Sequence, residues 1–264
     1  MKRRPLLTRS AALAAAFAAV PAAVPAAAAL LAAAAPAPAR AADAPAGRSY
    51  VALSMVGDKL TVVTYVPSVG VVDANRREVL PVADATFDKD ALRAAAQVIL
   101  KAEPGVPLSF LLANLHSHYE RHERLFVSAR LELPPDLLQA VRRTRASHLL
   151  LVSKRRGEAR LQTQQGSMGT GRLEGLGFYL DHQTPTMNVE TREVAPGFIA
   201  PYFYADVSLV DLATLDLVRT VPVTSAIALF STRAEGGIAP WDGLSANEKV
   251  EIIRTLVTRE IGAA

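Results

Sequence analysis

The first 41 residues limit most strongly what this chain can fold into. An uncharged, alanine-rich run from residue 11 to residue 35 is followed by Ala39-Arg40-Ala41, the small-residue pattern of a cleavage site. The run is preceded by a basic head that contains Lys2, Arg3, Arg4 and Arg9. These are the three parts of a secretory signal peptide. We therefore expect residues 1–41 to be removed, which leaves 223 of the 264 residues to fold.

The same run is long enough to raise the alternative of a retained membrane anchor. Two prolines, Pro21 and Pro25, interrupt it, and alanine gains little free energy on transfer into lipid. We therefore expect no stable transmembrane anchor after cleavage, and a periplasmic or secreted protein. The Arg3-Arg4 pair is typical of a twin-arginine signal, but the rest of that motif is imperfect, so the choice between this route and the general secretory route stays open.

Charge and cysteine content exclude several classes of function. The whole chain carries 29 Lys and Arg against 25 Asp and Glu, but five of those cations lie in residues 1–41, which hold no carboxylate. The remaining 24 cations and 25 carboxylates nearly balance, so we expect no nucleic-acid partner. Cysteine is absent. An exported chain without disulfides needs a well-packed core, and cysteine nucleophiles and thiolate metal sites are excluded.

The mature chain predicts a flexible lead-in at residues 42–48 and a single domain at residues 49–264. Residues 50–56 and 59–66 are rich in β-branched residues and are separated by Gly57-Asp58, a pattern typical of a hairpin. A helix follows, with Asp88 as its expected N-cap and Pro104-Gly105 as its end.

Further elements complete the predicted fold. A helix begins at Pro134-Pro135-Asp136, and residues 149–152 indicate a buried strand. Residues 202–209 alternate between two faces and are followed by a partner strand at residues 217–223. Ser245 and Glu248 form the capping box of a last helix. We expect an α+β fold: a mixed or mainly antiparallel sheet with two or three packed helices.

Residues 134–224 resemble a known periplasmic α/β domain. A helix, a strand at residues 147–152, a glycine-rich segment and a hairpin carrying Ser208-Leu209-Val210-Asp211-Leu212-Ala213-Thr214 follow one another in the same order. This order is similar to that of the domain shared by the Tol-system β-propeller protein, in its amino-terminal part, and the curli secretion lipoprotein. Leu215 stands where the family has glycine, in a turn that requires positive φ. The resemblance implies an envelope accessory or interaction domain without catalytic residues.

One short segment has the residue types of a metal site, with three histidines and two glutamates among eight residues. Imidazole and carboxylate groups bind zinc or copper. If the segment is helical, two of its histidines share one face, because they are four residues apart. The candidate ligands are His116, His118, His122 and Glu123. A solvated polar connection explains the same residues, so a bound metal is the alternative and no cofactor is the main expectation.

A second set of residues forms the strongest charge cluster of the mature chain. It predicts a docking face for an envelope protein or an anionic envelope component, while a solubilising face is the competing interpretation. The set consists of Arg142, Arg143, Arg145, Lys154, Arg155, Arg156 and Arg160.

Signatures of catalysis are weak. The five glycines of residues 166–177 are not followed by Gly-Lys-Ser/Thr, so a phosphate loop is not indicated. Ser167 lies in Gly-Ser-Met-Gly, one residue short of a nucleophile elbow. The sequence therefore predicts an exported, non-enzymatic envelope protein, with a metal-binding protein as the alternative and a hydrolase as a remote one.

Overall fold

The computed structural model describes residues 47–57, 59–68, 73–82, 85–113, 115–119, 124–163, 166–187, 192, 194–229 and 241–264. The predicted signal peptide lies outside these residues. Residues 45–264 group into one compact unit. Among the described residues, none of the helices combines the length and the apolar character that a membrane crossing requires.

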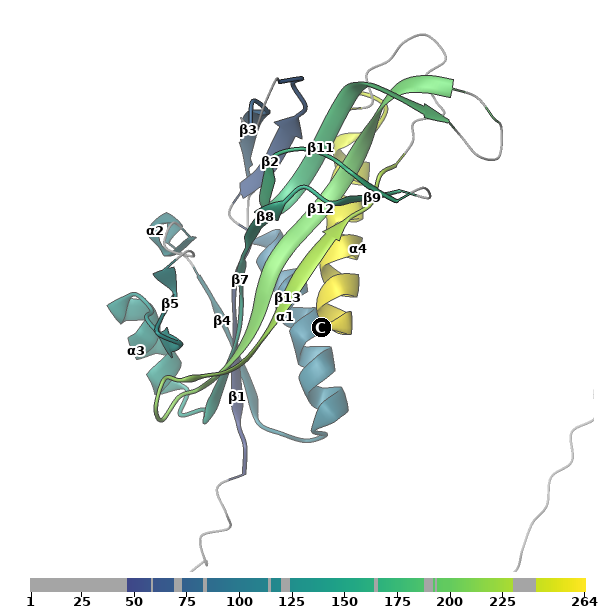
Figure 1. Cartoon of the computed structure of the whole chain (residues 1–264). Coiled ribbons are helices and arrows are strands. Elements are labelled where there is room, and N and C mark those ends of the chain that lie inside the picture. Colours follow the sequence, from purple (N-terminus) through teal and green to yellow (C-terminus); the bar gives the residue numbers. More distant parts are fainter. Residues whose placement is uncertain are drawn as a thin grey trace, which may run out of the picture. The chain divides into compact units, whose positions relative to one another are not determined.

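A nine-stranded mixed sheet forms the frame of the fold (Figure 1). Its strands are β1 (Tyr50–Met55), β2 (Lys59–Thr64), β3 (Arg76–Pro81), β4 (Leu108–Leu112), β7 (His148–Lys154), β8 (Arg156–Glu158), β11 (Arg172–Met187), β12 (Val194–Asp211) and β13 (Leu217–Ala226). The order is β3-β2-β11-β12-β7-β1-β4, with β13 paired to β12 and β8 paired to β11. Two small sheets join β5 (Phe126–Val127) to β6 (Arg130–Leu131) and β9 (Leu161–Thr163) to β10 (Gly166–Met168).

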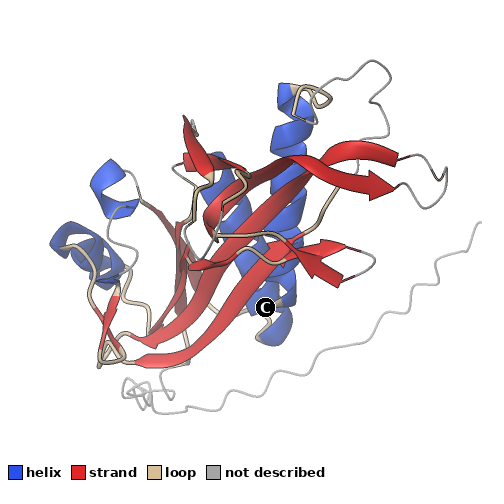
Figure 2. Cartoon of the chain, turned by 45° about the horizontal axis from the view of Figure 1, so that its top comes forward, coloured by secondary structure: helices blue, strands red, loops and turns tan. Residues whose placement is uncertain are grey.

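Four helices are described: α1 (Thr86–Ala102), α2 (His116–Tyr119), α3 (Pro135–Arg143) and α4 (Ala246–Ala263). Helices α1 and α4 lie side by side on one face of the sheet (Figures 1 and 2). Apolar side chains of the sheet, among them Phe178 and Phe203, pack beneath them. Asp90 of α1 accepts a hydrogen bond from Arg254 Nε of α4 at 2.7 Å, which fixes the two helices to each other. The predicted α+β class is confirmed.

The opposite face of the sheet is covered in two places. Helix α3 packs on β1 and β7 through Leu137 and Val141. Farther along, the β8–β9 segment covers Tyr202 and Tyr204 of β12, and Leu161 belongs to the same cluster. The alternation predicted for residues 202–209 is confirmed, because Phe203 faces the helices while its neighbours face this second layer. The space between the two covered regions is where the candidate site lies.

The predicted hairpin of residues 50–66 is wrong, although both strands exist. Strand β1 pairs in parallel with β4 and β7, whereas β2 pairs with β11 and β3. The reason is burial: all six residues of β1 are buried, while three of the six residues of β2 are partly exposed. A strand that is buried on both faces is stabilised most between two parallel neighbours in a covered part of a sheet, and β1 lies between β4 and β7 in this way.

Asp88 is not the N-cap of α1, which is a correction to the sequence-based assignment. Ala85 holds the cap position, and Asp88 lies in the first turn with a fully buried side chain. Its Oδ1 accepts hydrogen bonds from Ser54 Oγ at 2.6 Å and Val56 N at 2.9 Å. The carboxylate thus joins the carboxyl end of β1 to the beginning of α1.

The hairpin of β12 and β13 is confirmed by an antiparallel ladder from Tyr202 to Val210. Its turn contains Leu215, which has a φ of 65°. This is the position at which the family resemblance led us to expect glycine. The Leu215 backbone is held on both sides, since its N–H donates to Asp211 O and its carbonyl accepts from Leu131 N, each at 2.8 Å. These bonds offset the roughly 1 kcal/mol that a left-handed conformation costs a non-glycine residue.

The capping box of α4 is confirmed. Ser245 Oγ accepts from Glu248 N at 3.3 Å, and the Glu248 carboxylate accepts from Ser245 N at 2.8 Å. We expect Ser245→Ala to lower the free energy of unfolding by about 1 kcal/mol, because it leaves an N–H group of the first turn without its side-chain acceptor. Urea denaturation followed by circular dichroism measures this loss. Ser245→Asp should retain most of the stability, and equal losses in both variants would contradict the capping role.

Candidate functional site

A cavity of about 330 Å³ lies on the face of the sheet opposite α1 and α4. We call it the basic cavity, because its lining carries five cations and one carboxylate. The charged lining residues are Lys59, Arg77, Lys154, Arg156, Arg172 and Glu174. The uncharged lining residues are Thr61, Val63, Val79, Tyr119 and Tyr202.

Strand periodicity places these side chains on one face. Successive residues of a strand point to opposite faces of the sheet. In β2, Lys59 and Thr61 line the cavity, while Leu60 packs in the core under the helices. In β3, Arg77 and Val79 face the cavity in the same way. Because β2 and β3 form an antiparallel pair with Val63 opposite Arg77, the two strands present one continuous wall.

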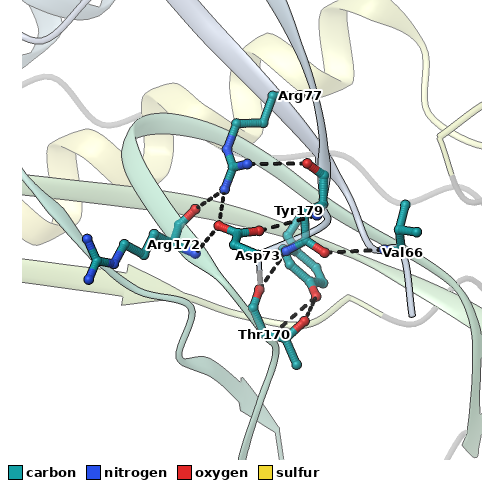
Figure 3. A network of polar contacts seen from close by, with 7 residues as sticks. Val66, Asp73, Arg77, Thr170, Arg172 and Tyr179 are labelled. Atoms are coloured by element: carbon teal, nitrogen blue, oxygen red, sulfur yellow. Dashed lines mark hydrogen bonds and ion pairs between the residues drawn. The ribbon is translucent and has the colours of Figure 1, made fainter. Parts of the chain in front are cut away.

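Arg77 is held in place by a network of polar contacts (Figure 3). Its guanidinium forms an ion pair with Asp73 and donates to Arg172 O at 3.1 Å and to Asn75 O at 3.2 Å. Asp73 also accepts from the Arg172 backbone N–H at 3.1 Å. Burial alone raises the pKa of Asp73, but the bonds from Arg77 and from the backbone of Arg172 and Asn75 hold it below its ordinary value. The carboxylate is therefore charged at neutral pH, and it orients Arg77.

The same network ties the cavity wall to the glycine-rich segment. Asn75 Nδ2 donates to Thr170 O at 2.7 Å, and the Thr170 N–H donates to the Tyr179 hydroxyl at 3.3 Å. Gly171 has φ 81°, and a Cβ atom there would lie 2.5 Å from an Asp73 oxygen. Glycine at position 171 is thus required by the close approach of Asp73.

Lys154, the last residue of β7, lines the cavity. Its ammonium lies 5.6 Å from the centre of the Tyr119 ring, a cation–π contact. Its aliphatic stem passes over Gly175, where an added Cβ would lie 3.3 Å from the lysine side chain. Tyr119 itself is fixed, because its hydroxyl donates to Ala113 O at 2.7 Å and contacts Asp88 Oδ2 at 2.9 Å. The lysine side chain is thereby positioned by its contacts with Tyr119 and Gly175.

Tyr202 forms the floor of the cavity. Its ring is fully buried, and its hydroxyl donates to the Thr61 carbonyl at 3.1 Å. Burial raises the pKa of the Tyr202 hydroxyl well above its ordinary value. The side chain therefore stays neutral, and it adds no negative charge that would offset the surrounding cations.

The structure divides the seven predicted docking cations into separate groups. Arg142 and Arg143 end α3 and Arg145 precedes β7, whereas Lys154 ends it. A strand of seven residues places those ends about 20 Å apart. Only Lys154 and Arg156 line the basic cavity.

Two of the remaining cations are paired with carboxylates. Arg155 forms an ion pair with Asp206 at 2.9 Å and lines a second cavity of about 450 Å³ together with Lys154 and Arg156. Arg160 forms an exposed pair with Glu158 at 3.4 Å. The docking role of the full set of seven is still a prediction, and the geometry separates its members.

The four candidate metal ligands are only partly described. His122 and Glu123 lie outside the described residues. His116 is exposed in α2, while His118 is buried and its Nε2 lies 2.7 Å from Asp136 Oδ2. The hydrogen bond from His118 lowers the pKa of Asp136. No cluster of three metal-binding side chains occurs among the described residues, and the metal hypothesis stays a prediction.

Ser167 lies in the exposed strand β10, and neither of the two cavities includes it. Sequence reasoning missed three cations of the basic cavity, Lys59, Arg77 and Arg172, which lie far apart in the chain. Alternation along β2 was the one available signal, since it places Lys59 and Thr61 on the same face. The pairing of β2 with β11, which completes the wall, has no local signature.

No protein-family model matches the chain, and no curated protein matches it in sequence. Similar solved structures include the PelC dodecamer from Paraburkholderia phytofirmans, with 11% identity over 82% of this chain and 84% of that chain at TM-score 0.31. A homolog of the neuraminyllactose-binding hemagglutinin from Helicobacter pylori has 9% identity over 86% of each chain at TM-score 0.36. Protein XCC0632 from Xanthomonas campestris has 10% identity over 83% and 86% at TM-score 0.33.

TM-scores this low support no conclusion about the function of this chain. None of the three structures is the Tol-system protein or the curli lipoprotein, so the resemblance drawn from residues 134–224 stays a prediction.

Proposed function

We propose that this protein is exported and acts, without catalysis, as a binding component of the bacterial cell envelope, where it docks an anionic partner at the basic cavity. The observation that carries the proposal is the cavity itself, with five cations around one carboxylate. The signal-peptide pattern of residues 1–41 supports export. The near-neutral charge of the mature chain makes this concentration of cations a local feature and not a consequence of composition.

Contacts within the cavity favour binding over a merely solubilising role. A solubilising cation needs only contact with water, whereas Arg77 is oriented by Asp73 and by two backbone carbonyls. Lys154 is guided by Tyr119 and Gly175. Groups that are already ordered lose little conformational entropy when an anion binds, which increases affinity.

Charge reversal inside the cavity tests the proposal. Lys154→Glu combined with Arg156→Glu is expected to reduce the amount of protein that sediments with washed envelope membranes by about tenfold, because the attraction is electrostatic. Sedimentation of the wild-type protein should fall as salt is raised, since exposed charges are screened over about 10 Å at 0.1 M salt.

Arg142→Glu combined with Arg143→Glu is the matched control. It changes the net charge by the same amount at the far end of β7, so it should leave sedimentation close to the wild-type level. Equal losses in the two double variants would show that only net charge matters. Binding that ignores ionic strength would also contradict the proposal.

A further inference from the structure

We infer that the protein forms a twofold-symmetric dimer, in which strand β4 of one copy pairs with β4 of a second copy in antiparallel direction. Strand β4 (Leu108–Leu112) stands at the end of the strand order, and β1 is its one paired strand among the described residues. The inference is independent of the basic cavity, whose wall is formed by β2 and β3 near the opposite end of that order.

The outer edge of β4 offers a row of backbone groups to a further strand. Tyr50 N donates to Pro107 O at 2.8 Å, which fixes the side of β4 that faces β1. The N–H and C=O groups of one residue point to the same side of a strand, and successive residues alternate. Residues 107, 109 and 111 therefore face β1, whereas Leu108, Phe110 and Leu112 direct these groups to the open edge. Such a row is a template for pairing with another strand.

The side chains along this edge are apolar and exposed. Phe110 is 51% exposed and Leu112 is 40% exposed, and Leu115, which follows the strand, is 50% exposed. Residues 104–115 contain no charged side chain. Exposed apolar side chains that gather at an unpaired strand are typical of a surface for protein association.

Two other edge strands of the described sheet have features that oppose such pairing. Strand β3 contains Arg77 and Glu78 and ends at Pro81. Strand β13 contains Arg219 and Pro222. Charged side chains and proline at an edge prevent the addition of another strand, and β4 has neither. The protection of β3 and β13 makes the open edge of β4 a distinct feature.

A second copy of the chain is the partner that fits this edge. When two β4 strands run antiparallel about a twofold axis at Phe110, the two Phe110 residues lie opposite each other and exchange both backbone hydrogen bonds. Leu108 of each copy then lies opposite Leu112 of the other, so these pairs are all apolar. No like charges meet, and a partner selected by charge finds no complement in residues 104–115. The same surface therefore supplies both halves of the interface.

Sedimentation equilibrium of the mature protein tests the inference. We expect mostly monomer at about 1 µM and mostly dimer at about 1 mM, since a short strand pair belongs to the weak class of interfaces. Phe110→Lys should raise the dissociation constant by about tenfold or more, because it removes an aromatic pair and sets two like charges opposite each other. Val218→Lys is the matched control, because Val218 is 57% exposed on β13, and this variant should dimerise like the wild type.

Mixing two variants tests the twofold register. Phe110→Glu alone should associate as poorly as Phe110→Lys. An equimolar mixture of the two should recover dimers, because opposite charges then face each other across the axis. Pairing with a strand of an unrelated protein predicts no such recovery.

Cysteine substitutions give a second measurement of the register, since the chain has no cysteine of its own. Opposite residues of a hydrogen-bonded antiparallel pair have Cα atoms about 5.5 Å apart, within the reach of a disulfide. Phe110→Cys should therefore form linked dimers on oxidation. Ser109→Cys should not, because the two copies of residue 109 lie diagonally, about 7–8 Å apart.

Three results would overturn the inference. They are a wild-type protein that stays monomeric at the highest concentration, dimers that Phe110→Lys leaves intact, and a mixture of the lysine and glutamate variants that stays monomeric. Circular dichroism of each variant checks that it is folded. If Phe110→Lys does not fold, the cysteine variants decide: linked dimers of Phe110→Cys alone support the inference, and equal linking of Phe110→Cys and Ser109→Cys contradicts it.

Discussion

Replacing Asp88 by alanine is expected to lower the free energy of unfolding by about 3–5 kcal/mol, one of the two largest effects in this protein. The Asp88 carboxylate is fully buried and has four hydrogen-bond partners. Alanine leaves the Ser54 hydroxyl and the N–H groups of Val56 and Gly57 without an acceptor in the interior. Each buried donor that loses its partner costs about 1–3 kcal/mol.

Asp88→Ala should also affect the basic cavity. Tyr119 contacts Asp88 and carries Lys154 over its ring, so Asp88→Ala removes one of the two groups that fix the tyrosine. Urea denaturation measures the stability of Asp88→Ala, and Tyr119→Phe separates the hydroxyl contact from the rest. Glu78→Ala is the control, because it also removes a carboxylate but from an exposed position on β3. If Asp88→Ala and Glu78→Ala lose the same stability, the buried network is not what holds α1 to β1.

Gly177→Ala is expected to have the second large effect, about 3 kcal/mol of stability or a failure to fold. A Cβ atom at position 177 would lie 1.9 Å from the Thr61 carbonyl oxygen and 2.8 Å from the Tyr202 hydroxyl. The first of these atoms belongs to the backbone of β2, the strand that pairs with β11 at this point. A backbone atom cannot rotate away, so the two strands must separate.

Gly262→Ala provides the control for this prediction. Gly262 lies in α4 with nothing within 4 Å of an added Cβ, and alanine there should leave the stability equal or slightly higher. Thermal unfolding followed by circular dichroism compares the two variants. A Gly177→Ala protein as stable as the wild type would mean that β2 and β11 do not approach as closely as described.

Local features of the fold were predictable from the sequence. The capping box of Ser245 and Glu248 depends on residues three positions apart, and the β12–β13 hairpin depends on a short turn with alternating flanks. The partner of β1 was not predictable in this way. Its neighbours β4 and β7 lie more than fifty residues downstream, and the turn-like Gly57-Asp58 favoured a hairpin locally. The pairing of β1 with β4 and β7 depends instead on the burial of both faces of β1.

The candidate site was predictable only in part, for the same reason. Lys154 and Arg156 stood out because they belong to a run of cations, and both line the cavity. Arg155, between them, lies in the link between β7 and β8 and pairs with Asp206, so its neighbours in sequence did not reveal that it is absent from the lining of the basic cavity. Alternation places Lys59 on one face of β2, but neither Lys59 nor Arg77 has a local sign of the cavity, since the sheet order that brings β2 and β3 beside β11 arises from long-range pairing.

Strand β12 is long enough to join the two halves of the sheet. Its 18 residues span about 60 Å, and it pairs with β11 over its first part and with β7 over its last part. Neither half of the sheet can come apart without breaking its ladder with this shared strand. Amide protons on β11 and β7 should therefore exchange with solvent through the same global opening, so the two halves behave as one cooperative unit.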